Sequence, residues 1–245
     1  STGIEIDSID EEFGILNIDD SQYINVFDQL LGSWIKEHGS IPVIASGMIG
    51  SRQGWMEVPY LDCPTGTEQL ARNLTYLTIN SKIICNPLSM AIVPGIQIFE
   101  NGIPDVMRGE ETQVAGLVCS KHKVGLCILP GTHSKWVFIN KGMIENFTTF
   151  MTGEIFALMA KHSIINRLMD GKSFNRDDFI IGCKQSLNSS YGFLKETFSA
   201  RTMGLFEKVK PKGIHSYLSG IIIGNEIKDG INIYYKNLSN KEETI

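Results

Sequence analysis

Hydrophobic and polar positions in the second half of the chain follow an order that predicts three strands and then a helix. Apolar runs at 124–128 and 136–139 flank a short polar turn, and a third run at 143–147 follows a Lys-Gly turn. Over 154–169 the apolar positions recur at helical spacing and form one broad face. The pattern therefore predicts a strand–strand–strand–helix unit over residues 124–169.

The same periodicities predict the elements elsewhere in the chain. A polar residue before the first helix, Asp20 or Ser21, is expected to cap it. Small residues four apart in 218–226 predict a helix that packs closely on another, with Gly224 and Glu226 near a nucleotide. Helices are expected at 20–37, 67–77, 110–120, 190–208 and 213–228, strands at 42–45, 90–99 and 231–235, and a loop at 60–64.

Length and composition fit a globular protein of one or two domains. The 245 residues suit one large domain or two of about 120 residues. The polar stretch 119–123 suggests a boundary between an N-terminal lobe, 1–120, and a C-terminal lobe, 121–245. A net charge of −5 argues against nucleic-acid binding, which needs a basic surface. No apolar run reaches about 18 residues, so we expect a cytoplasmic protein without a membrane partner.

Cysteines and histidines give no sign of a disulfide framework or a metal cluster. The five cysteines are odd in number and none forms a C-x-x-C pair, while the five histidines are scattered. The cysteines, with Cys85, Cys119 and Cys127 in or beside apolar runs, are expected to be buried free thiols in a reducing compartment.

The polar turn within 129–136, Leu-Pro-Gly-Thr-His-Ser-Lys-Trp, is the strongest candidate for a phosphate site. Gly131 has no side chain, so phosphate oxygens can approach backbone N–H groups, with hydroxyls and an ammonium alongside. A strand–strand–strand–helix unit with a phosphate-sized first turn suggests the duplicated fold shared by sugar kinases, actin and the Hsp70 ATPase. The candidate phosphate-binding residues are Gly131, Thr132, His133, Ser134 and Lys135.

Two adjacent carboxylates, Glu110 and Glu111, begin a predicted helix just after Gly109. Acidic residues there often only complement the helix dipole. Alternatively, one of them faces a cleft and accepts a proton from a substrate hydroxyl or holds magnesium through water. The neighbouring Arg108 suits a bidentate grip on a carboxylate or phosphate, although a surface salt bridge is also consistent.

Three further segments carry weaker signals. Three glycines between 47 and 54 follow a strand, and the loop is either merely flexible or a ligand site using Arg52 and Trp55. Thr152 is a candidate helix cap. Arg201 lies in an apolar helix, where a salt bridge and substrate binding are equally consistent.

Taken together, these stretches resemble the 2-dehydro-3-deoxygalactonokinase family, in order from Gly47 to Glu226. The sequence has no Walker P-loop, Rossmann turn or nucleophile elbow, so phosphoryl transfer here would be of the sugar-kinase type. The matching stretches are 46–51 with 54–55 and 59–61, 106–113, 129–137, 151–154, 198–201 and 217–224.

The resemblance implies a two-lobed α/β protein with the ribonuclease H-like fold of actin and hexokinase. It implies transfer of the ATP γ-phosphate, with Mg2+, to the terminal hydroxyl of 2-dehydro-3-deoxy-D-galactonate, giving the 6-phosphate in galactonate breakdown. The N-terminal lobe would bind the sugar acid and the C-terminal lobe the nucleotide. The family's N-terminal Asp-x-Gly-Thr-like motif and its Gly-Thr-rich adenosine segment are not found, so we expect a fold truncated at both ends.

On this interpretation each candidate residue receives a role. Glu110, favoured over Glu111, orients the attacking hydroxyl or a magnesium-bound water. Arg52, Arg108 and Arg201 are candidates for the substrate carboxylate, and Trp55 for packing on the sugar chain. The residues 131–135 cradle the ATP phosphates.

Two alternatives belong to other classes of function. The chain could bind the sugar acid without catalysis, or it could be an actin-like or Hsp70-like ATPase. The second is disfavoured because no peptide-binding domain or polymer-forming insertion is evident in the sequence. The epimer preference and the oligomeric state, a homodimer included, stay open.

Overall fold

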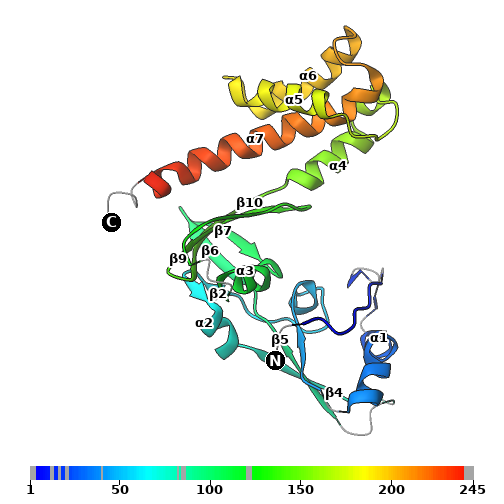
Figure 1. Cartoon of the computed structure of the whole chain (residues 1–245), viewed down its shortest axis with the longest axis vertical. Helices are drawn as coiled ribbons and strands as arrows, with labels where there is room; N and C mark the ends of the chain where they lie inside the picture. The colour runs from blue at the N-terminus through cyan, green and yellow to red at the C-terminus, as the bar shows by residue number, and fades with distance from the viewer. Residues whose placement is uncertain are drawn as a thin grey trace. The chain divides into compact units, whose positions relative to one another are not determined.

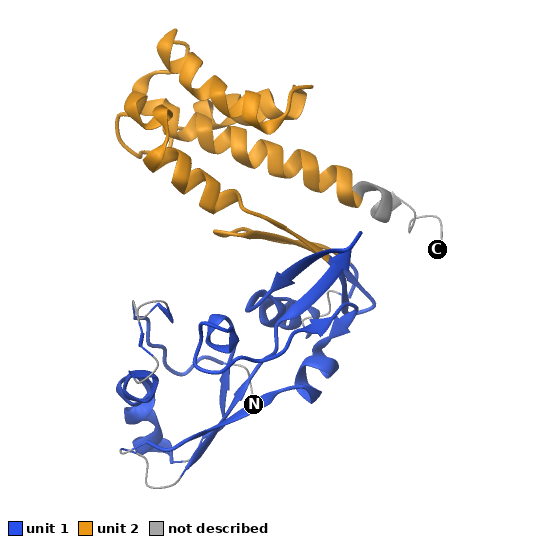
Figure 2. Cartoon of the chain, turned by 180° about the vertical axis from the view of Figure 1, so that it is seen from behind, with its two compact units in different colours: residues 1–124, 139–146 blue, residues 125–138, 147–245 orange. Residues whose placement is uncertain are grey.

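The protein divides into two compact units. Unit 1 consists of residues 1–124 and 139–146, and unit 2 of residues 125–138 and 147–245 (Figure 2). The description rests on a computed structural model, which covers residues 4–11, 14–15, 18–19, 22–39, 41–81, 83, 87–119 and 123–239, with side chains to 234.

Unit 1 contains two three-stranded sheets, each mixing parallel and antiparallel pairs. In the order β1-β5-β4, β1 is parallel and β4 antiparallel to β5, and in the order β2-β6-β7, β2 is parallel and β7 antiparallel to β6. The elements are α1 (Tyr23–His38), β1 (Val43–Ala45), η3 (Met48–Gly50), β2 (Leu61–Asp62), β3 (Thr65–Gly66), α2 (Thr67–Arg72), β4 (Thr75–Ile79), β5 (Leu88–Ile92), β6 (Ile96–Glu100), β7 (Ile103–Met107) and α3 (Glu110–Cys119).

Two tight turns set the strand registers near the candidate site. Asn101 and Gly102 join β6 to β7 with φ of 51° and 80°, and Lys141 and Gly142 have φ of 51° and 79°. Positive φ at both central residues matches the twist of the flanking antiparallel strands. The Lys-Gly turn expected from the sequence is confirmed, and the first hairpin places Met107 opposite Ile96 next to Arg108.

The strand–strand–strand–helix unit forms in the predicted order, and all of it except residues 139–146 belongs to unit 2. A four-stranded sheet has the order β3-β10-β9-β8. The elements are β8 (Gly125–Leu129), β9 (Ser134–Asn140), β10 (Met143–Phe150), α4 (Thr152–His162), η4 (Ile164–Leu168), α5 (Arg176–Asn188), α6 (Phe193–Leu205) and α7 (Pro211–Ser239).

The long helix α7 organises the helical part of unit 2, where it contacts α4, α5 and α6 (Figure 1). Its glycines allow this packing: a Cβ at Gly220 would lie 2.1 Å from the Phe179 oxygen, and one at Gly224 would lie 2.9 Å from Ser186 Cβ. The predicted close packing is therefore confirmed. Ile214, Leu218 and Ile221 are fully buried and form the core with Ala200 of α6.

Several predicted elements differ from the structure. The expected helix 67–77 ends at Arg72, and Thr75–Ile79 form β4, because β-branched and aromatic residues favour a strand there. The expected strand 90–99 is two strands in different sheets, β5 and β6, separated by the segment that holds Pro94 and Gly95. The expected strand 231–235 belongs to α7, where Tyr234 is buried against Trp136 and Phe138.

Smaller differences concern element ends and burial. The helix predicted to reach 169 ends at His162 and is followed by η4, and helix α5 was absent from the prediction. Thr152 is the first residue of α4, not its cap, which is Met151. The short strand predicted at 42–45 was interpreted from its apolar residues as buried, but Ile44 is 67% exposed. Cys119 is exposed, and Cys63, Cys127 and Cys183 are half-buried free thiols. Asp20, Ser21 and Cys85 lie outside the described residues.

Candidate active site

In unit 2 the glycine turn lies directly on the first turn of α4. A Cβ at Gly153 would lie 2.5 Å from the Gly131 oxygen, so no other residue fits there without movement. The Glu154 N–H donates to the Thr132 oxygen at 3.0 Å. Gly131, Thr132 and His133 are exposed. The structure therefore presents an open backbone turn beside a helix N-terminus, a setting that favours anions.

The side chain of His133 is held in place by an acid. Its Nε2 lies 2.6 Å from Glu154 Oε2, and both side chains are partly exposed. This contact orients the imidazole at the edge of the turn.

Ser134 and Trp136 are anchored away from solvent on one buried carboxylate. Ser134 Oγ and Trp136 Nε1 donate to Glu226 Oε1 at 2.6 and 2.7 Å. Ser134 is 1% exposed and Glu226 9%. Because one Glu226 oxygen accepts from both side chains, Glu226 of α7 fixes the start of β9 directly behind the turn.

Lys135 lies in a different environment from Ser134. It is 5% exposed, and its Nζ donates to Thr149 Oγ1 at 2.7 Å. Successive strand residues point to opposite faces of a sheet, so Ser134 and Lys135 cannot both line one face. Of the five candidate phosphate residues, three are open to solvent and two are committed to buried contacts.

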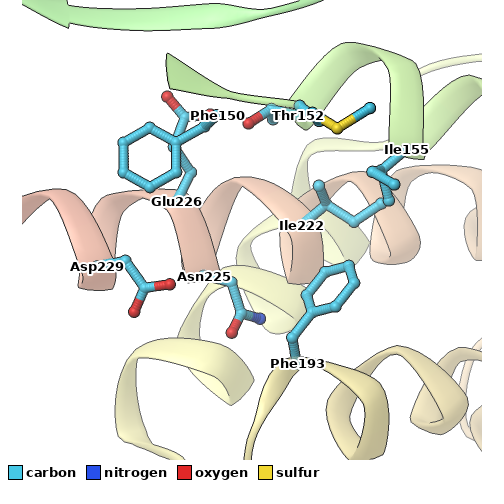
Figure 3. Close-up of a pocket in the computed structure, with 9 residues that line it drawn as sticks. Phe150, Thr152, Ile155, Phe193, Ile222, Asn225, Glu226 and Asp229 are labelled. Carbon is cyan, nitrogen blue, oxygen red and sulfur yellow. The ribbon is translucent and has the colours of Figure 1, made fainter. Parts of the chain in front are cut away.

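A cavity of about 350 Å³ opens beside the turn, lined by Gly131, Ser134, Gly153 and Glu226 among others. Glu226 also lines a smaller cavity of about 140 Å³, which has an apolar wall and the polar groups of Asn225 and Asp229. Figure 3 shows Glu226 reaching from α7 toward Phe150 and Thr152. The turn thus adjoins space that a small ligand can enter.

In unit 1 the two glutamates that begin α3 differ sharply in exposure. Glu111 is fully buried, and its carboxylate accepts from the Gly109 N–H at 2.7 and 2.9 Å. Burial raises the pKa of the Glu111 carboxyl, and the backbone hydrogen bonds oppose that shift. Glu110 is half-buried, and its Oε2 accepts from the Arg108 N–H at 3.1 Å.

The Arg108 side chain is fixed by two neighbours, Val58 and Tyr60. Its Nη2 donates to the Val58 oxygen at 2.6 Å, and its guanidinium carbon lies 4.2 Å from the centre of the Tyr60 ring. Within the described residues, Nε and Nη1 are buried without a hydrogen-bond partner. Two guanidinium nitrogens are therefore left for an anion or water to satisfy.

The glycine loop and the acidic helix start meet in unit 1. A Cβ at Gly109 would lie 3.2 Å from Gly47 Cα, and one at Gly50 would lie 3.0 Å from Arg108 Nη1. Gly109 has φ of 117°, a conformation that glycine alone adopts readily. The structure thus brings together the two unit 1 segments that the sequence analysis singled out.

A model of the 2-keto-3-deoxy-galactonokinase family matches residues 1–238. The chain belongs to this family of kinases. It is 30% identical over 222 residues to the Escherichia coli 2-dehydro-3-deoxygalactonokinase, covering 91% of this chain and 72% of the relative.

Two further members are similar over most of this chain. A Rhizobium meliloti protein provisionally named 2-dehydro-3-deoxygalactonokinase is 34% identical over 199 residues, which are 76% of this chain and 60% of the relative. A crystal structure of a Sinorhizobium meliloti protein, provisionally described in the same way, superposes with a TM-score of 0.79 at 29% identity and covers 89% of this chain and 72% of that one. This chain therefore spans about three fifths to three quarters of its relatives in the kinase family.

The three remaining candidate residues, Arg52, Trp55 and Arg201, each contact other parts of the protein. Arg52 is largely exposed and pairs with Glu57 at 3.4 Å. Trp55 stacks on Tyr23 with ring centres 5.5 Å apart and packs on the unit 1 core. Arg201 of unit 2 donates to the Ile164 oxygen at 3.3 Å. For Trp55, this packing accounts for the residue without a ligand.

Sequence reasoning missed the groups that hold the site in place. Tyr60, Val58 and Thr149 contact candidate residues, yet each lies far from its partner along the chain or carries no motif. In the described part of the chain, no three His, Cys, Asp or Glu side chains gather as a metal site, and no helix is long and apolar enough to span a bilayer.

Proposed function

We propose that the protein transfers the γ-phosphate of ATP to the terminal hydroxyl of 2-dehydro-3-deoxy-D-galactonate, giving the 6-phosphate. Membership of the 2-keto-3-deoxy-galactonokinase family supports this reaction, and so do the names of its relatives. The structural observation that carries it is the exposed turn of Gly131, Thr132 and His133 on the N-terminus of α4. A ribonuclease H-like, two-lobed architecture and a role in galactonate breakdown belong to the same proposal.

The nucleotide phosphates are assigned to the exposed part of the turn. Backbone N–H groups around Gly131 and the Thr132 hydroxyl are open to an anion, and the exposed imidazole of His133 lies beside them. Ser134 is a positioning residue, since its hydroxyl already donates to Glu226. Lys135 is assigned to positioning as well, because its ammonium is bonded to Thr149.

Glu110 is assigned as the group that accepts or orients the proton of the attacking hydroxyl. It is accessible, whereas Glu111 is fully buried on the Gly109 N–H. Phosphoryl transfer has a loose transition state, so placing the hydroxyl in line and neutralising charge contribute most of the catalysis. Magnesium bound with ATP would supply part of that neutralisation, and the accessible Glu110 could hold one of its waters where Glu111 could not.

Arg108 is the preferred group for the carboxylate of the sugar acid. Its position is fixed by Val58 and Tyr60, so little side-chain entropy remains to be lost on binding. Arg52 is exposed and would have to leave Glu57, and Arg201 is bonded to a backbone oxygen. We rank the three arginines in that order.

The test is an ADP-release assay with the galactonate-derived and gluconate-derived keto acids. Glu110→Gln should lower kcat by about 100-fold or more, the size expected for a lost base, with little change in KM. Glu100→Gln, an exposed acid on β6, is the matched control and should keep full activity. A Glu110→Gln enzyme with wild-type kcat would overturn the assignment.

The non-catalytic alternative predicts a different result. Calorimetry would then show binding of the keto acid to the wild-type chain, with no ADP release and no effect of added nucleotide. Arg108→Lys should weaken that binding under either reading, because lysine cannot reproduce a bidentate contact.

A further inference from the structure

Unit 2 holds a second, larger cavity that the proposed reaction does not use. Its volume is about 530 Å³, within the range of small-molecule sites. Phe156 and Ala157 of α4 line it. It continues to Met169, which follows η4, and to His215 near the start of α7. The exposed residues of the glycine turn are not among its lining.

The rim of this cavity is basic. Lys161 of α4 and Lys172 lie on it together with the imidazole of His215. Neither lysine has a carboxylate oxygen within 4.0 Å among the residues that the structure covers. Lys161 also complements the C-terminal end of the α4 dipole, but Lys172 lies on a loop and has no such role. Among the described residues, no acidic side chain therefore pairs with either ammonium group.

The pKa of His215 is consistent with a positively charged rim. Burial lowers the pKa of its imidazole, and the Lys172 ammonium lowers it further. Like charges gathered around a cavity raise the local concentration of anions.

The floor of the cavity is apolar and suits a flat group. The rings of Phe156 and His215 meet edge to face, with centres 4.9 Å apart and planes at 78°. Ala157 and Ala160 are small, so the helix surface between the ring and the lysines is shallow. Met169 completes the floor, and its flexible thioether adapts to aromatic ligands.

We propose that this cavity binds an organic phosphate with a planar ring. The ring lies on Phe156 and Met169, and the phosphate lies between Lys161 and Lys172. Binding requires both halves, because an anion alone leaves the apolar floor uncovered and a neutral ring alone leaves the ammonium groups unpaired. Phe156 also lines the cavity beside the glycine turn, but none of residues 131–135 lines this one, so the kinase assay and the test below can succeed or fail independently.

Calorimetry with three probes tests the two halves on the full chain. Phenyl phosphate should bind at least about tenfold more tightly than inorganic phosphate or phenol. The double variant Lys161→Gln/Lys172→Gln should lose that advantage. Lys184→Gln/Lys195→Gln removes two exposed lysines outside the cavity and should bind like the wild type. Ala157→Leu should weaken phenyl phosphate by filling the cavity without changing its charge.

An NMR titration of His215 reports the location. Bound phenyl phosphate should raise the imidazole pKa, because a nearby dianion favours the protonated ring. Equal losses in both lysine pairs would mean general attraction to a charged surface and would overturn the proposal. So would an unmoved His215 titration, or equal affinity for phenyl phosphate and inorganic phosphate.

Discussion

Two groups of candidate residues, one in each unit, are held in place by opposite means. In unit 2, Ser134 and Trp136 are fixed by hydrogen bonds to the buried carboxylate of Glu226. In unit 1, the start of α3 is fixed by the close approach of Gly109 to Gly47, where no side chain intervenes. One part depends on a polar group that must be present, and the other on atoms that must be absent.

This difference determines which substitutions each part tolerates. A buried polar anchor tolerates a replacement that keeps an acceptor in the same place, since the cost arises from unpaired donors. A glycine contact tolerates no side chain, whatever its polarity, because backbone atoms cannot move aside cheaply. Chemically conservative changes should therefore be mild at the Glu226 anchor and severe at the contact of Gly109 with Gly47.

Removing the unit 2 anchor should have the largest effect on stability. Glu226→Ala leaves the Ser134 hydroxyl and the Trp136 indole without their acceptor, and each buried unpaired donor costs about 1–3 kcal/mol. We expect the free energy of unfolding to fall by about 3 kcal/mol, measured by denaturant titration.

Two variants sharpen the interpretation. Glu226→Gln keeps an amide oxygen for the same donors and should lose about 1 kcal/mol. Glu207→Ala removes an exposed acid and should be close to neutral. Equal losses for the Ala and Gln variants at position 226 would show that the carboxylate does not act as an acceptor for the strand.

The unit 1 contact should be broken by a single methyl group. Gly109→Ala puts a Cβ 3.2 Å from Gly47 Cα at φ of 117°, so we expect a loss of about 2 kcal/mol in unfolding free energy and a fall in kcat. Gly102→Ala is the matched control, since its φ is 80° but no heavy atom lies within 4 Å. It should cost about 1 kcal/mol, the backbone strain alone, with kcat unchanged.

If the two alanine variants were equally stable and equally active, the close approach of Gly109 to Gly47 would contribute nothing to stability or activity. The measurements are denaturant unfolding and the ADP-release assay.

The sequence could predict those features that depend on nearby residues. The strand–strand–strand–helix order and the Lys141–Gly142 turn follow from local periodicity and local φ preference, and both are confirmed. Gly131 and its exposed neighbours belong to the same category, because a glycine turn between two apolar runs is a local pattern. Their function as a phosphate site stays a prediction.

Partners distant in the chain could not be predicted in this way. Ser134 and Glu226 are 92 residues apart, and Arg108 and Val58 are 50 apart, so no periodicity links them. The extension of α7 through 231–235 was missed because β-branched and aromatic residues there favour a strand locally, while packing in the helix prevails. Tyr234, fully buried on Trp136, is part of that packing.

Glu110 and Glu111 show the same limit at the scale of one residue. They are chemically identical, but successive helix positions differ by about 100° around the axis. This rotation buries Glu111 and leaves Glu110 accessible. Choosing between them therefore required the orientation of α3, which the sequence does not specify.

The smallest predicted effect concerns this buried neighbour. Burial raises the pKa of Glu111 above its unfolded value, which is about 4.3. Between these two pKa values the folded protein binds more protons than the unfolded chain, so the contribution of Glu111 to stability falls as pH rises through that window. Glu111→Gln should remove this part of the pH dependence and change stability at pH 7 by less than about 1 kcal/mol, because the amide oxygen still accepts from Gly109.

Unfolding measured from about pH 4.5 to 7.5 checks the sign. The wild type should lose stability relative to Glu111→Gln as pH rises, while Glu100→Gln, which alters an exposed acid, should follow the wild type. A Glu111→Gln curve parallel to the wild type would mean that the buried carboxylate is as easily ionised in the folded protein as in the unfolded chain. In that case Glu111 would again be a candidate base beside Glu110, and the difference in exposure would no longer decide which of the two accepts the proton.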